Sequence, residues 1–241
     1  QGKCNVALGI YSGCGLTTAQ DNVFIGTKAG CCQSTTGWST LVGAQAGQKS
    51  IGQMNVAVGY GALLGSGTPS ANTGGCNTIV GPYAGMSISS GIKNVLFGMY
   101  AGCGISTGAC NVFLGVYAGD NSSLTGCRNI AIGYNVALPS ASGNDQFVIG
   151  CSGSCWISGD SSFNLYDKDG KPLGFKPDDD GNLLAGDDAG SSLDGSNGCF
   201  NIFLGESAGR KVTSGGCNVF LGKYAGCNGT SSASSSVLIG Y

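Results

Sequence analysis

A short apolar block recurs along the chain at nearly constant spacing. Each copy opens with Asn, Ser or Gln, continues with three mostly apolar residues and closes with Gly, as in the NVFIG of residues 22–26. Most successive copies are about 17 residues apart, a period that is too short for a two-helix repeat or a propeller blade. The 13 copies open at Asn5, Asn22, Ser39, Asn55, Asn77, Asn94, Asn111, Asn129, Gln146, Asn182, Asn201, Asn218 and Ser236.

This pattern predicts an all-β fold, because two glycines at fixed places in each unit disfavour a helix. We expect a parallel β-solenoid or β-roll in which each unit forms one coil of two or three short strands joined by glycine corners. The Gly that closes each triplet permits a positive φ or a close approach of neighbouring backbones. Stacked coils would align the opening Asn side chains into a hydrogen-bonded ladder.

The middle residue of the triplet is apolar in every unit. Since alternate residues of a strand face opposite ways, we expect the flanking pair, such as Val23 and Ile25, to point into the coil and the middle residue to point outward. A strand that is apolar on both faces is normally covered on both. The pattern therefore predicts packing against other copies of the chain or, alternatively, against another strand of the same chain. The predicted packing residues are Phe24, Leu41, Ile79, Leu96, Phe113, Phe203, Phe220 and Leu238.

The repeat divides the chain into repeats at 1–150, an insertion at 151–181 and repeats at 182–241. Within the insertion, the FNLYDKDGKPLGF of residues 163–175 predicts a β-hairpin that turns at Asp169 and Gly170. Clustered acidic side chains offer the hard oxygen ligands that Ca²⁺ prefers. The spacing departs from an EF-hand and from calcium β-rolls, so we favour a solvated turn and predict no other cofactor. The calcium candidates are Asp167, Asp169, Asp178 and Asp180.

Composition narrows the class of protein. The chain has 46 Gly among 241 residues, yet 41% of its residues are hydrophobic, which excludes a disordered polar tract. Only 10% are charged, the net charge is −2 and there is no basic run, so nothing supports nucleic-acid binding. No apolar stretch approaches the roughly 18 residues of a membrane-spanning helix, so we expect no membrane insertion.

Catalytic chemistry has little support in this sequence. The chain has no His, so it has neither a Ser-His-Asp nor a Cys-His pair, and we expect a protein that is not an enzyme. A carbohydrate-active enzyme that uses two of the clustered carboxylates is a weaker alternative. The recurring Tyr forms either a stripe on which sugars stack or packing at a coil corner or between chains. This column contains Tyr11, Tyr83, Tyr100, Tyr117 and Tyr224.

The 13 Cys, without His or CxxC pairs, favour disulfides and an oxidising exterior over zinc sites. Equivalent residues on adjacent coils lie about 4.8 Å apart, within the usual Cα separation of a disulfide. We predict pairs between adjacent coils: Cys14 with Cys31 (or Cys32), Cys110 with Cys127, and Cys199 with Cys217. Cys4, Cys76, Cys103 and Cys227 lack such a partner and are predicted to link chains. The alternative is that they are small buried apolar residues.

The units NVFLG, NVAVG and NIAIGY resemble the NSVAIG-type repeats in the heads of trimeric autotransporter adhesins. They are still more similar to the N-x-x-x-G-x-x-A repeats of phage and algal-virus tail-fibre proteins. The resemblance covers about 1–150 and 182–241, and it implies a homotrimer of parallel coils that serves in attachment. We therefore expect a non-catalytic structural fibre or adhesin shaft at a virion or cell surface, with a carbohydrate or protein receptor. A subunit of a self-assembling extracellular filament is the alternative.

Overall fold

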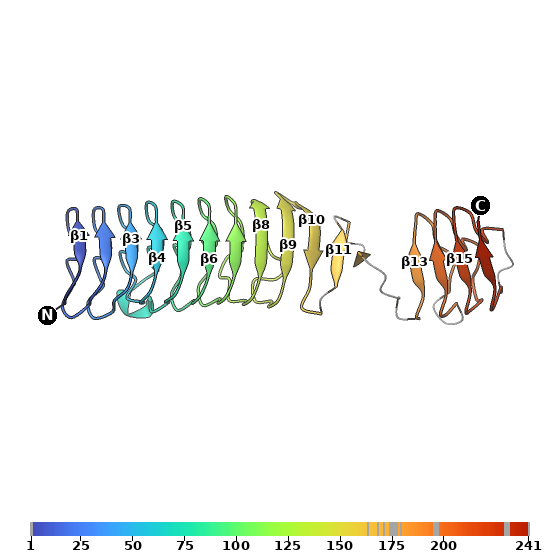
Figure 1. Cartoon of the computed structure of the whole chain (residues 1–241), viewed down its shortest axis with the longest axis horizontal. Helices are drawn as coiled ribbons and strands as arrows, with labels where there is room; N and C mark the ends of the chain where they lie inside the picture. The colour runs from blue at the N-terminus through green and yellow to red at the C-terminus, as the bar shows by residue number, and fades with distance from the viewer. Residues whose placement is uncertain are drawn as a thin grey trace. The chain divides into compact units, whose positions relative to one another are not determined.

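The computed structural model describes residues 2–162, 164–167, 169–170, 172–173, 178, 180–194, 198–228 and 232–240. Contacts divide the chain into two compact units, Gln1–Lys171 and Pro172–Tyr241. The described residues form strands and turns, with a single turn of 3-10 helix, η1 (Pro69–Ala71), as the exception. The all-β prediction is therefore confirmed (Figure 1).

Nine parallel strands form most of the first unit, one from each repeat copy. Each pairs with the next in register, so that Val95, Leu96 and Phe97 lie beside Val112, Phe113 and Leu114. The prediction of a parallel β-solenoid with one coil per unit is confirmed. The strands are β1 (Val6–Leu8), β2 (Val23–Ile25), β3 (Thr40–Val42), β4 (Val56–Val58), β5 (Thr78–Val80), β6 (Val95–Phe97), β7 (Val112–Leu114), β8 (Ile130–Tyr134) and β9 (Phe147–Cys151).

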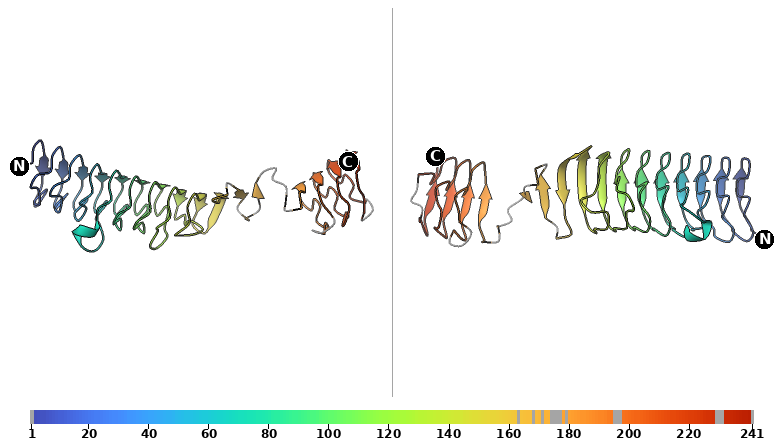
Figure 2. Two further views of the ribbon diagram at one scale, coloured as in Figure 1. Left: turned by 90° about the horizontal axis from the view of Figure 1, so that it is seen from below. Right: turned by 180° about the vertical axis from the view of Figure 1, so that it is seen from behind.

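Each of these coils contains one short strand instead of the expected two or three. The rest of the coil is turn, which still bonds coil to coil, as where Gly85 N–H donates to Ala101 O (2.9 Å) and Gly102 N–H to Ala118 O (2.8 Å). The longer unit that opens at Asn55 places its extra residues in η1, which protrudes from the loop side of the coils (Figure 2).

Antiparallel strands follow the parallel stack. The chain reverses at Ser152 and Gly153, and β10 (Ser154–Gly159) then runs antiparallel to β9 and to β11 (Leu165–Asp167). In the sequence, Asp169 and Gly170 stand between β11 and β12 (Pro172–Leu173), the strand with which the second unit begins. The ends of the predicted hairpin, Phe163 and Phe175, lie outside the described residues.

The second unit repeats the parallel arrangement. The strands of its four-stranded sheet pair in the same register as those of the first unit, so that Phe203 lies between Leu184 and Phe220. They are β13 (Leu183–Ala185), β14 (Ile202–Leu204), β15 (Val219–Leu221) and β16 (Val237–Ile239).

The middle residue of each triplet points into the coil, so the predicted orientation of the strands is wrong. Phe113 is 0% exposed, whereas the flanking Val95 and Phe97 of the neighbouring strand are 40% and 58% exposed. The reason is that one strand per coil leaves room inside for one side chain per triplet, beside the opening Asn. Of the residues predicted to pack between copies, those buried in their own units are Phe24, Leu41, Ile79, Leu96, Phe113, Phe203 and Phe220, while Leu238 in β16 is 43% exposed.

The predicted Asn ladder is confirmed and lies inside the coils. Buried Asn94 donates from Nδ2 to Asn77 Oδ1 (3.1 Å) and to Gly108 O (2.9 Å). Its Oδ1 accepts from the backbone N–H (3.0 Å) and Nδ2 (3.1 Å) of Asn111. Every polar atom of the amide is therefore used, which removes the cost of burying it.

The glycine that closes the triplet has both properties expected of it. Gly26 has φ +127°, and a Cβ there would lie 2.6 Å from the carbonyl oxygen of Gly43 on the next coil. Any other residue would push adjacent coils apart, so this column sets how closely the coils stack.

Candidate assembly surface

The outward face of β1–β9 is almost entirely apolar. It consists of the first and third residues of each triplet, and no charged side chain stands at these positions. The first column contains Val6, Val23, Thr40, Val56, Thr78, Val95, Val112, Ile130 and Phe147, and the second contains Leu8, Ile25, Val42, Val58, Val80, Phe97, Leu114, Ile132 and Ile149. Each of these residues is half-buried or exposed, so none contributes to the core of its own coil.

The apolar surface continues beyond the triplets. In β8, Tyr134 lies two residues after Ile132 and therefore faces the same way. The residues at the equivalent place in other units include Tyr60 and Met99, and both are exposed. The surface is thus at least three residue columns wide along much of the stack.

One edge of this face consists of residues with left-handed backbone. The residue before each opening has φ near +60°, including Trp38, Met54 and Arg128, although this region disfavours side chains other than Gly. Arg128 and Asp145 from this column line a single depression with Ile130 and Phe147 of the outward face, so the column borders the face directly.

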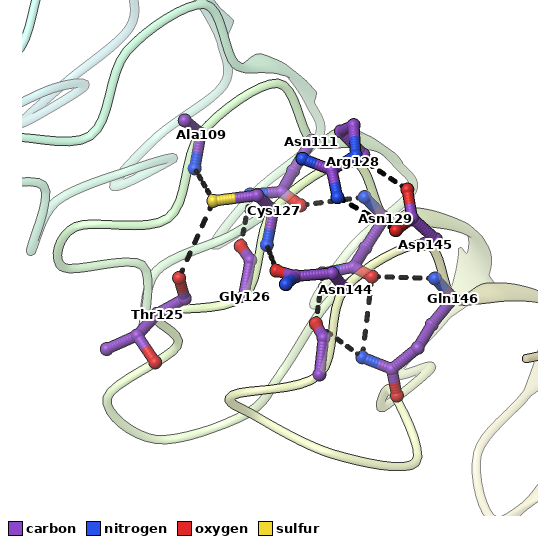
Figure 3. A network of polar contacts seen from close by, with 11 residues as sticks. Ala109, Asn111, Thr125, Gly126, Cys127, Arg128, Asn129, Asn144, Asp145 and Gln146 are labelled. Atoms are coloured by element: carbon purple, nitrogen blue, oxygen red, sulfur yellow. Dashed lines mark hydrogen bonds and ion pairs between the residues drawn. The ribbon is translucent and has the colours of Figure 1, made fainter. Parts of the chain in front are cut away.

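That depression has a volume of about 370 Å³ and lies between the outward side chains of β8 and β9 and the start of β11. Arg128 binds Asp145 through two hydrogen bonds, Nε to Oδ1 (2.6 Å) and Nη2 to Oδ2 (2.8 Å) (Figure 3). The hydrogen bond from Arg128 lowers the pKa of Asp145 below its usual value. Both side chains thus hold each other in place at the edge of the face.

A second carboxylate of the depression, Asp160, is bonded within its own turn. It accepts hydrogen bonds from Tyr166 Oη (2.8 Å) and Asn164 Nδ2 (3.1 Å). These two contacts, the tyrosine first, hold the pKa of Asp160 at about 2. The carboxylate therefore stays ionised and acts to close the turn before β11.

Three of the predicted tyrosines stack on one another. The ring centroids of Tyr83 and Tyr100 are 5.1 Å apart at 12°, and those of Tyr100 and Tyr117 are 4.9 Å apart at 8°. Because each face of Tyr100 is covered by a neighbouring ring, no sugar can stack on it. For Tyr100, the structure therefore favours packing over a stripe on which sugars stack. Tyr11 is exposed, and Tyr224 instead contacts Glu206 and Lys223.

All 13 cysteines are free in the structure, and only one of the predicted pairs brings its sulfurs together. The Sγ atoms of Cys14 and Cys31 are 2.8 Å apart. Burial, followed by the hydrogen bond with Cys14, raises the pKa of Cys31 to about 12. The Cys31 thiol is therefore protonated at neutral pH.

The other two predicted pairs are out of register by one residue. Arg128 N–H donates to Ala109 O (2.9 Å) and Ala109 N–H to Cys127 Sγ (3.4 Å), so Cys110 aligns with Arg128 and not with Cys127. Cys217 N–H likewise donates to Cys199 O (3.1 Å), which aligns Cys217 with Phe200. The Asn ladder causes this offset of one residue, because aligned opening residues also align the residues directly before them. Of the cysteines predicted to link chains, Cys4 and Cys76 are exposed, and Cys103 and Cys227 are half-buried.

The calcium candidates form turns. Asp167 Oδ1 accepts from the N–H of Asp169 (2.9 Å), and Asp178 Oδ1 accepts from those of Asp180 (3.1 Å) and Asn182 (2.7 Å). These side chain to backbone contacts are typical of Asx turns. Among the described residues, no group of three or more His, Cys, Asp or Glu is placed to hold a metal ion.

No family model matches the chain, and neither does a curated protein or a solved structure. The resemblance to tail-fibre and adhesin repeats therefore stays a prediction from the sequence. Within the part of the chain that the structure describes, no helix has the length and apolar character needed to cross a bilayer.

Oxidation should join Cys14 to Cys31 as a disulfide. The two thiols lose two protons and two electrons to oxidised glutathione, which leaves as two thiols. Since the linked residues are 17 positions apart, the closed loop should stabilise the first unit by roughly 3 kcal/mol. Mass spectrometry of unreduced peptides identifies the bond, and thermal unfolding of Cys31→Ser measures its effect. Cys32→Ser is the matched control and should leave the bond intact. Recovery of Cys31 linked to Cys32 would contradict this pairing.

Proposed function

We propose that this chain is a non-catalytic structural protein, the shaft of an extracellular attachment fibre on a virion or cell surface. The observation that carries the proposal is the stack itself. Within each unit, nearly the same groups join successive coils, namely the closely packed glycine column and the buried ladder of opening residues, most of which are Asn. A structure in which each coil is the template for the next extends in one direction with the number of repeats, as a shaft requires.

The assembly that we propose for this fibre is a homotrimer, as the resemblance to tail-fibre and adhesin-head repeats implies. A carbohydrate or a protein on the host surface is the partner that we propose for attachment. The apolar outward face of β1–β9 supports assembly, because such a face left in water favours aggregation.

Electron microscopy with an antibody against the purified chain tests this proposal. We expect gold label on discrete fibres that project from virions or cells, because a shaft must lie outside the surface that it serves. Label along long uniform filaments would favour the alternative of a self-assembling filament. Label confined to the cell interior would contradict both. Pre-absorbing the antibody with the purified chain is the control, and it should abolish the label.

A further inference from the structure

We infer that the outward face of β1–β9 packs against the same face of other copies of this chain. The inference rests on the proposed fibre, because it names the surface by which the copies of that fibre join. It replaces the surface expected from the sequence, since the middle residues of the triplets fill the coils. In a trimer, the three faces would turn toward a common axis.

The first argument is that this face needs a cover. Parallel sheets occur almost only with both faces covered, and their strands are then apolar on both sides. In β6, the middle residue Leu96 is buried by the chain's own coil, while Val95 and Phe97 on the other side are exposed. The apolar outward residues are thus those of a covered sheet, although the single chain leaves them in water.

The second argument is the size of the face. Nine strands spaced about 4.8 Å apart span about 40 Å. The five positions from the first triplet residue to the column of Tyr60 and Met99 add about 13 Å of width. The face therefore measures on the order of 500 Å², as large as the largest apolar patches of ordinary monomers. Two such faces in contact bury about 1,000 Å², the size at which specific interfaces begin.

The third argument identifies the cover as another copy. Side chains on the face recur once per coil, at the strand spacing of about 4.8 Å. Interlocking along the whole stack requires a partner with the same repeat, which another copy has by construction. The outward face also has no charged side chain at its triplet positions, so two copies that meet there experience no charge repulsion. Identical strands pack in this dry, interdigitated manner in steric zippers.

The test is to place a charge on the face. Phe97→Lys suits this purpose because Phe97 is exposed in the single chain, so the coil should still fold. Thr107→Lys is the matched control, since Thr107 is an exposed residue of the same repeat unit that lies outside the strand. Light scattering measures the mass of the full chain over a range of concentrations, and circular dichroism checks that each variant is folded.

We expect the unmodified chain and Thr107→Lys to form the same oligomer. Phe97→Lys should raise the dissociation constant on the order of 100-fold or more, because each interface would bury unpaired like charges. If Phe97→Lys does not fold, Val58→Glu in β4 tests the same face.

Two results would overturn the inference, and they differ in what they say of the fibre. If the unmodified chain forms an oligomer that folded Phe97→Lys and Val58→Glu leave intact, the copies join elsewhere and the proposed fibre stands. If the unmodified chain is a monomer at every concentration, both the inference and the proposed homotrimer fail.

Discussion

Replacing Phe113 with Ala should destabilise the first unit by about 3 to 5 kcal/mol, whereas replacing Phe97 with Ala should cost a single chain less than about 1 kcal/mol. The two residues stand on neighbouring strands, β7 and β6, but on opposite faces. Phe113 is fully buried and Phe97 is largely exposed. Truncating Phe113 leaves a cavity inside the coil, while truncating Phe97 removes surface that water already reaches.

Urea unfolding followed by circular dichroism measures both free energies, and protein concentration separates the two roles. The loss caused by Phe113→Ala should not depend on concentration, because its contacts lie within one chain. Any loss caused by Phe97→Ala should grow with concentration if that side chain packs against another copy. Equal losses at low concentration would contradict the assignment of the two faces.

Replacing Asn94 with Asp should unfold or strongly destabilise the first unit at neutral pH. The Nδ2 of buried Asn94 donates to two acceptors, Asn77 Oδ1 and Gly108 O. A carboxylate at this place has no hydrogen to donate, and it puts a buried charge against both oxygens. Burial and repulsion would together cost several kcal/mol.

The pH dependence of this variant has a definite sign. Burial next to two acceptors raises the pKa of the new carboxyl in the folded chain above its unfolded value of about 3.9. The folded state then binds the proton more tightly. The part of the loss that is due to the charge is absent below about pH 4 and grows as pH rises, by about 1.4 kcal/mol per unit, until the folded pKa is reached.

Asn144→Asp is the control for this experiment. Asn144 is exposed, and its Oδ1 accepts from the backbone N–H of Cys127 (2.7 Å), which a carboxylate oxygen can also do (Figure 3). We expect its urea midpoint to remain near that of the unmodified chain from pH 4 to pH 8. An Asn94→Asp variant that is equally stable at pH 7 would show that the ladder does not hold the coils together.

Part of the orientation error could have been avoided from the sequence. The opening Asn94 and the middle residue Leu96 are two positions apart, so they face the same side of the strand. An amide ladder shielded from water must lie inside the coil, and the middle residue must lie there with it. A buried Asn ladder therefore already implies that the middle residue points into the coil, as the structure shows.

The pairing of cysteines depended on a finer detail. Cys110 and Cys127 both stand close before an opening Asn, but at one and two residues from it. A difference of one residue changes the column and so the neighbour on the next coil. Cys14 and Cys31 stand at the same distance from their openings, and their sulfurs do meet.

By itself, the sequence determined the parallel stack of coils. The period of about 17 residues, the invariant Gly and the recurring Asn each require equivalent residues to lie side by side. Only the tertiary structure decided which apolar residues fill the coil and which face water. All three triplet positions are mostly apolar, so the alternation of residues along the strand does not tell which of them face the interior of the coil. The width of a coil with one strand decided it, since that interior holds one side chain from each triplet and leaves the other two as an exposed face.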